Sequence, residues 1–258
     1  MQTYTEKGFR GSDKEWESMC IPFDEDAKIC LNGVIDRVDL CSLPGEELIK
    51  IIDYKSSDSQ DLSLAKVYYG LQMQLLTYLE AAKEMVEKEH KGKEAVPAAM
   101  LYYAIKEKNL DWKPESEEEY EKRVLDSMKC KGYVNEEPEI IGHLDKSIVN
   151  GGELIPGQKS VVVPVAVDKK GLLKKNSETL STKDFETLIA HTKEKMKECG
   201  KAILDGKIEA IPYVYEDNDG CTYCPYGSVC GHESKKDGVR EMKKMSDDEV
   251  WEALYGDD

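Results

Sequence analysis

The sequence predicts an α/β protein in which helices flank a central β-sheet. Apolar runs typical of buried strands alternate with segments in which apolar residues recur every three or four positions. A proline–glycine turn separates the first two strand-like runs, and no internal repeat or low-complexity linker interrupts the order. At 258 residues, 40% of them hydrophobic, the chain can bury an ample core as one large domain or two small ones.

The first predicted unit is an antiparallel hairpin. Its two apolar runs span about residues 30–40 and 47–57, and the loop between them contains Pro44-Gly45, a strong turn signal. Residues 1–28 are polar and irregular, and we interpret them as a lead-in with room for one early strand.

Three further elements follow the hairpin. A helix is predicted from about 63 to 88, and a strand of aromatic and aliphatic residues from 98 to 105. Ser116 and Glu119 have the spacing of a capping box that opens a helix through Met128. Residues 129–157 lack periodicity and are interpreted as an excursion.

The last part of the chain predicts a strand at 161–167, which Pro164 restricts to an edge or a bulge. A helix opens near Ser181 and ends near residue 206, and Ser246 caps a short final helix.

Charged residues at the end of the hairpin form the first candidate site. Side chains alternate along a strand, so Asp53 and Lys55 share one face, Tyr54 points the other way, and the partner strand can bring Asp36 alongside. Such a group suits a hard divalent cation and a phosphodiester. The alternative is a pair of solvated charges at a strand end, because a D-x-K tripeptide alone is weak evidence.

The helix after the hairpin carries a second candidate group. Gln74 and Tyr78 are four residues apart and therefore lie on one helix face. They either edge a core-facing stripe or contact a nucleic-acid backbone.

Three of the eight cysteines are closely spaced. Cys221, Cys224 and Cys230 have the spacing of a metal or cluster site rather than of a disulfide framework. With His232 as a fourth ligand they would form a zinc site, and spacing alone weighs zinc and iron–sulfur equally. The other five are expected to be buried or incidental thiols: Cys20, Cys30, Cys41, Cys130 and Cys199.

The net charge of −16 argues against a generic nucleic-acid coat protein but leaves room for an enzyme with a local basic lining. Lysines gather at 159–175 and again at 240–244, each group more in keeping with a solvated face than with a phosphate track. No apolar run approaches the ~18 residues of a membrane span, and the start has no signal-peptide core, so no membrane contact and a cytoplasmic location are expected.

The motifs GVIDRVD, IIDYKSS and YYGLQMQLLTYLEA, in this order and with these gaps, resemble the RecB-type nucleases of the PD-(D/E)xK superfamily. The segment EAIPYVYEDNDGCTYCPYGSVCGHE is similar to the C-terminal iron–sulfur region of the AddB family, the nuclease-bearing subunits of AddAB helicase–nucleases. The resemblance covers about residues 30–232.

This resemblance implies a restriction-endonuclease-like core with a mixed sheet and a role as a DNA exonuclease in double-strand-break repair and recombination. Asp36, Asp53 and the carbonyl of Tyr54 would hold Mg²⁺ or Mn²⁺, and Lys55 would orient the attacking water. Gln74 and Tyr78 would contact DNA.

The resemblance also implies a domain order and partners. A nuclease core would span 29–210, an iron–sulfur loop 211–233 and a tail 234–258, with DNA and an AddA-like helicase–nuclease subunit as partners. In the family, the three cysteines of this loop and a fourth far upstream bind a 4Fe-4S cluster.

Two features depart from the family pattern. No Cys-Pro dipeptide precedes residue 224, and no histidine precedes His90, where the family has a metal-associated histidine. We therefore expect a C-terminal piece of a longer polypeptide with an incomplete metal site, an incomplete or absent cluster and a loose tail after about Ile211. The alternatives are a non-catalytic module that grips DNA or a partner, and a zinc-stabilised α/β protein with another role.

Overall fold

The computed structural model describes residues 1–11, 16–56, 61–105, 111, 113–114, 116–233 and 238–256. The loop expected at 56–60 falls largely outside the described residues.

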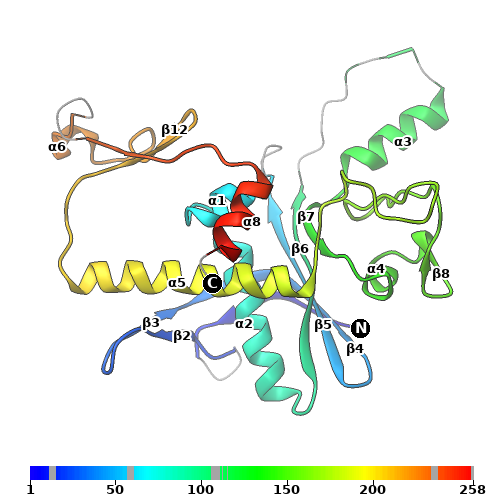
Figure 1. Ribbon diagram of the computed structural model, residues 1–258, viewed down its shortest axis with the longest axis horizontal. Helices are drawn as coiled ribbons and strands as arrows, with labels where there is room; N and C mark the ends of the chain where they lie inside the picture. The colour runs from blue at the N-terminus through cyan, green and yellow to red at the C-terminus, as the bar shows by residue number, and fades with distance from the viewer. Residues whose placement is uncertain are drawn as a thin grey trace.

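A six-stranded mixed sheet forms the centre of the protein (Figure 1). Its strand order is β1-β4-β5-β6-β7-β10, with parallel pairing between β5 and β6 and between β7 and β10. The strands are β1 (Gln2–Phe9), β4 (Gly33–Ser42), β5 (Glu46–Lys55), β6 (Glu94–Ala104), β7 (Lys131–Asn135) and β10 (Thr179–Leu180). The predicted α/β class and the hairpin, β4 and β5, are confirmed. Residues 1–28 are more than a lead-in, because β1 pairs along the length of β4.

One face of the sheet is covered by α1 (Leu64–Tyr68), α2 (Gln74–Glu89), α5 (Thr182–Leu204) and α8 (Asp247–Tyr255) (Figure 1). The large apolar core on this side includes Val38, Ile51, Leu79, Phe185 and Val250, all fully buried. Alternate residues of the same strands point to the opposite face, so the two sides of the sheet have separate cores.

The second core lies under α4 (Pro138–Leu144), the 3₁₀ helix η1 (Lys146–Ile148) and the small hairpin of β8 (Val149–Asn150) and β9 (Glu153–Leu154). Leu101, Val134, Ile141 and Val163 contribute to it. Beyond the sheet lie the helix α3 (Glu117–Ser127), the hairpin of β2 (Met19–Pro22) and β3 (Lys28–Leu31), and a small sheet of β11 (Tyr213–Tyr215), β12 (Asn218–Asp219) and β13 (Arg240–Glu241).

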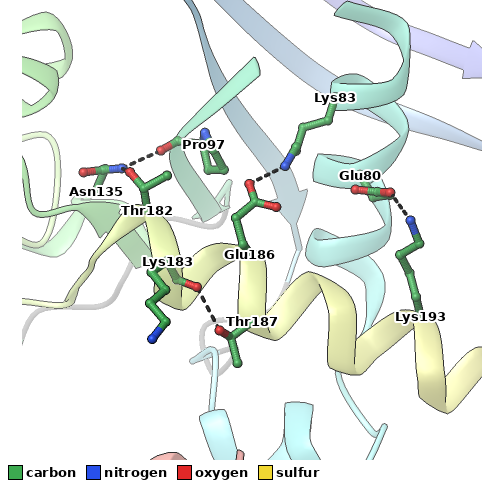
Figure 2. A network of polar contacts seen from close by, with 9 residues as sticks. All are labelled: Glu80, Lys83, Pro97, Asn135, Thr182, Lys183, Glu186, Thr187 and Lys193. Carbon is green, nitrogen blue, oxygen red and sulfur yellow. Dashed lines mark hydrogen bonds and ion pairs between the residues drawn. The ribbon is translucent and has the colours of Figure 1, made fainter. Parts of the chain in front are cut away.

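Ion pairs and hydrogen bonds fasten α5 across α2 and β7 (Figure 2). Glu186 and Lys193 on α5 pair with Lys83 and Glu80 on α2. The fully buried Asn135, at the end of β7, donates both to the carbonyl of Pro97 and to the hydroxyl of Thr182. These contacts hold the long helix over the sheet face that carries the candidate site.

Several sequence-based expectations are wrong in detail. The helix predicted over 63–88 is broken into α1 and α2, and the segment 129–157 contains a strand of the main sheet, β7, and the helix α4. The segment 161–167 is no regular strand: it makes isolated bridges, including one between Lys159 and Ala166. The capped helices at Ser116, Ser181 and Ser246 are confirmed.

Two expectations about cysteines and the tail are also corrected. Cys20 and Cys30 are not free thiols, because they face each other across β2 and β3 and form a disulfide. The tail after Ile211 is not loose throughout: α8 packs near α1 and buries Val250 in the main core.

Candidate metal and phosphodiester site

The two predicted carboxylates lie side by side at one edge of the sheet. Arg37 on β4 pairs with Ile52 on β5, so the next step of this antiparallel register sets Asp36 opposite Asp53. Asp36 Oδ2 accepts a hydrogen bond of 2.8 Å from the backbone N–H of Tyr54, which fixes its carboxylate beside the end of β5. The hairpin therefore brings together two residues that are 17 positions apart in the chain.

Asp53 is a buried carboxylate with little compensation. It is 3% exposed, and its Oδ2 makes no hydrogen bond of acceptable geometry, although Lys55 Nζ lies 2.6 Å away. Burial raises the pKa of Asp53, and the charge of Asp36 raises it further against the opposing effect of Lys55. A carboxylate in this environment is stabilised by an additional positive charge.

Lys55 is held by a chain of hydrogen bonds from the helix α2. Its Nζ donates to Gln74 Oε1 over 2.9 Å, and Gln74 Nε2 donates to the hydroxyl of Tyr78 over 2.9 Å. The Lys55 ammonium also lies 5.3 Å from the ring centre of Tyr102 on β6. The sequence-predicted residues Asp53, Lys55, Gln74 and Tyr78 thus form one connected group, open to solvent at Gln74.

Tyr102 is a member of this group that sequence reasoning missed. Burial, then the charges of Asp53 and Tyr78, raise its pKa to about 12, so its hydroxyl stays protonated beside the carboxylate. It sits in the predicted strand 98–105, but the register that pairs it with Asp53 is set by tertiary packing and cannot be obtained from either strand alone.

Arg37 and Asp39, which the sequence suggested as a structural pair, form a two-pronged ion pair with both distances 3.0 Å. Lys50 and Thr3 also contact the Asp39 carboxylate, so this residue is occupied by the sheet itself. Asp39 is therefore no ligand for an external group.

The two carboxylates suit a Mg²⁺ ion, which protein sites commonly bind through one or two carboxylates together with water and substrate phosphates. The buried, uncompensated oxygen of Asp53 supports this fit. Within the described residues, no group of three or more His, Cys, Asp or Glu side chains has a metal-binding arrangement.

The predicted cysteine site lies apart from the sheet, in the segment that carries β12 and α6 (Gly227–Cys230) (Figure 1). Cys221, Cys224 and Cys230 are all exposed free thiols. Slight burial, then Asp219 and the other two cysteines, raise the pKa of Cys221, so the three thiols lie near one another. They could supply part of a four-ligand set, but the described chain brings no fourth cysteine to them.

Comparison with known proteins agrees with this geometry. The family model of the PD-(D/E)XK nuclease superfamily matches residues 2–231. The chain belongs to this superfamily. PD-(D/E)XK nucleases generally use divalent metal ions, in agreement with the paired carboxylates of Asp36 and Asp53.

Curated relatives of this PD-(D/E)XK chain are named as one of the subunits of an ATP-dependent helicase/deoxyribonuclease. The protein from Lachnoclostridium phytofermentans is 35% identical over 236 residues, which is 90% of this chain and 20% of the relative. Those from Thermoanaerobacter sp. strain X514 and Clostridioides difficile are 34% and 30% identical over 95% and 96% of this chain. The chain therefore spans about a fifth of the length of these relatives. Among the described helices, none is both long and apolar enough to cross a membrane.

Proposed function

We propose that this chain is the Mg²⁺-dependent exonuclease domain of a cytoplasmic helicase–nuclease that degrades DNA during double-strand-break repair and recombination. The observation that carries the proposal is the buried, uncompensated carboxylate of Asp53 beside Asp36 and Lys55. Membership of the nuclease superfamily and relatives named as helicase/deoxyribonuclease subunits support the same reaction and an AddA-like partner.

The residues of the chain divide the work of phosphodiester hydrolysis. Asp36 and Asp53, with the carbonyl of Tyr54, would hold Mg²⁺ (or Mn²⁺), which when bound lowers the pKa of water and stabilises the leaving oxygen. Lys55 carries a positive charge that offsets the charge developing on the phosphate and orients the nucleophile.

The residues around Lys55 fix its position. Gln74, itself hydrogen-bonded to Tyr78, directs the ammonium toward Asp53, and the ring of Tyr102 shields its other side. Gln74 and Tyr78 also present polar atoms at the open side of the site, where a DNA backbone would approach.

The cysteine loop is proposed to contribute three ligands, Cys221, Cys224 and Cys230, to a 4Fe-4S cluster. Thiolates are the usual ligands of such clusters. Because the described residues offer no fourth cysteine, we derive no catalytic or redox step through the cluster.

The nuclease proposal is tested with linear DNA and Mg²⁺. Replacing Asp53 by Ala, or Lys55 by Ala, should slow cleavage about 100-fold or more, because each removes several kcal/mol of transition-state stabilisation. The control is Glu46→Ala, which removes an exposed carboxylate from the opposite end of the same strand and should leave the rate unchanged. Equal rates for the wild type and both site variants would overturn the assignment, and would favour a module that binds DNA without cutting it.

A further inference from the structure

A cavity of about 360 Å³ opens beside the candidate site, where β7 begins. The end of α3, the start of β7 and the segment 159–178 line it. We define the lysine cavity by three of its lining residues: Lys129, Lys131 and Lys159. Of the lysine group noted at 159–175, Lys159 alone is among its lining residues.

The lysine cavity continues the row of site residues across the sheet. Asp53 pairs with Tyr102, and Tyr102 pairs with Lys131, so the three side chains leave the same face of adjacent strands. Two strand spacings of nearly 5 Å place Lys131 roughly 10 Å from Asp53, which corresponds to about three nucleotides of a stacked strand. A strand with one phosphate at Asp53 can therefore reach the cavity with a flanking phosphate.

The inner part of the cavity has a surplus of positive charge. Lys159 Nζ lies 3.0 Å from Asp126 Oδ1, and Lys129 Nζ lies 3.6 Å from the same oxygen, so two ammonium groups share one carboxylate. The Lys129 side chain is only 13% exposed. Burial, then the charge of Lys159, lower the pKa of Lys129, as expected for a buried cation with incomplete compensation.

The outer part of the cavity holds a pair that is easily exchanged. Lys131 Nζ lies 2.5 Å from Asp61 Oδ1, and the Asp61 side chain is 76% exposed. Ion pairs this exposed contribute about 0–1 kcal/mol, so a phosphate can replace Asp61 as the partner of Lys131 at little cost. Burial, then the charges of Asp247 and Asp61, raise the pKa of Glu178, another lining residue, which weakens its opposition to an anion.

We propose that the lysine cavity binds a phosphodiester of the DNA strand being cut, about three nucleotides from the scissile phosphate at Asp53. This inference rests on the proposed nuclease function and adds to it a strand-positioning site. The occupant is a phosphate of a polymeric strand rather than free phosphate, because the cavity lies in register with the catalytic row.

The test measures binding of a long single-stranded oligonucleotide to the whole chain, in chelator and over a range of salt concentrations. Lys129→Ala combined with Lys159→Ala should lower affinity about tenfold at low salt and reduce the slope of log K against log salt by about 1, because each phosphate contact on a single strand contributes about 0.7. The matched control is Lys169→Ala with Lys170→Ala, which removes the same charge from an exposed turn of the same segment and should change neither value.

Further measurements separate the possible outcomes. Binding of a dinucleotide, too short to span the site and the cavity, should be the same for the wild type and the cavity variant. Thermal unfolding of both double variants checks that they are folded. A cavity variant that matched the control on the long oligonucleotide would overturn the inference and leave the nuclease proposal standing.

Two other results would also overturn it. Inorganic phosphate that displaced the oligonucleotide more effectively than chloride at equal ionic strength would assign the cavity to free phosphate. A wild type that bound no oligonucleotide even at low salt would overturn both this inference and the nuclease proposal.

Discussion

At the scale of single residues, neighbouring carboxylates of the hairpin have opposite electrostatic environments. Asp53 is buried beside one lysine and a second carboxylate, and its pKa is raised. Asp39 is as deeply buried, and burial alone would raise its pKa, but hydrogen bonds from Arg37, Lys50 and Thr3 hold that pKa below its ordinary value. The first environment favours an added cation, whereas the second is already complete.

Asp39 should therefore contribute to stability in a pH-dependent way. Because its folded-state pKa is lowered, its contribution is present above the unfolded value of 3.8 and is lost as the pH falls through the folded-state pKa. We expect Asp39→Asn to lower the free energy of unfolding by about 2–4 kcal/mol at pH 7, since it leaves two cations without their partner.

Denaturant unfolding of the wild type and Asp39→Asn across the acid range measures this contribution. The difference should shrink steadily below pH 3.8. The exposed Asp26→Asn provides the control, with no difference expected at any pH. A gap that stayed constant down to the acid limit would show that Asp39 acts through packing rather than through its charge.

The sequence predicts part of the site at this scale, and the limit has a physical cause. Strand alternation within one hairpin suffices to bring together Asp36, Asp53 and Lys55. Tyr102 and Lys131 enter the same row only through the pairing of β5 with β6 and of β6 with β7. That pairing joins strands separated by helices, and its register depends on the packing of the whole sheet.

At the scale of elements, the break between α1 and α2 has a function that helical periodicity conceals. Gly70 adopts a positive φ of 76°, and the Gln72 side chain bonds to the N–H of Ser63 and the carbonyl of Asp61. The break makes Gln74 the first residue of α2, with its side chain on Lys55. A continuous helix would present Gln74 in a different direction.

We expect Gly70→Ala to destabilise the fold by about 1–2 kcal/mol, because a residue with a Cβ is strained at this φ. Space is not the obstacle, since an added Cβ would meet Met73 Sδ at an ordinary 3.7 Å. Cleavage should slow as well, because Gln74 loses its fixed position. Thermal unfolding and the linear-DNA assay measure the two effects.

Gly227→Ala is the matched control for Gly70→Ala. This glycine opens the short helix α6 without a positive φ, and an added Cβ there would meet nothing within 4 Å. We expect a change within about 0.5 kcal/mol. If Gly70→Ala behaved like this control, the break between α1 and α2 would not depend on the glycine.

Other elements were harder to predict from the sequence because local pattern and tertiary role differ. The strand β7 contains a glycine, and Gly132, with φ 122°, lies so close to the carbonyl of Met100 that an added Cβ would be only 2.3 Å from its oxygen. Conversely, the valine-rich segment 161–167 resembles a strand in composition but folds as an irregular cover over the second core, with Val163 and Val165 buried there. Burial, not strand pairing, accounts for its valines.

At the scale of the whole molecule, the sheet with its helices and the cysteine segment differ in how they are anchored. The apolar residues around the cysteines are exposed: Tyr223 is 93% exposed and Val229 79%. Val250 on α8, further along the chain, is fully buried in the main core. The stability of the sheet should therefore not depend on the three thiols, whereas it should depend on α8.

We predict that replacing Cys221, Cys224 and Cys230 together by Ser changes the free energy of unfolding by no more than about 0.5 kcal/mol, because exposed side chains outside the core contribute little. Val250→Ala should cost about 2 kcal/mol by leaving a cavity in the core. Denaturant unfolding compares the two variants, and iron analysis of anaerobically purified wild type determines whether this chain holds a cluster. Stoichiometric 4Fe-4S, or a large loss of stability in the triple serine variant, would show that the cysteine segment has a fourth ligand and is coupled to the nuclease fold.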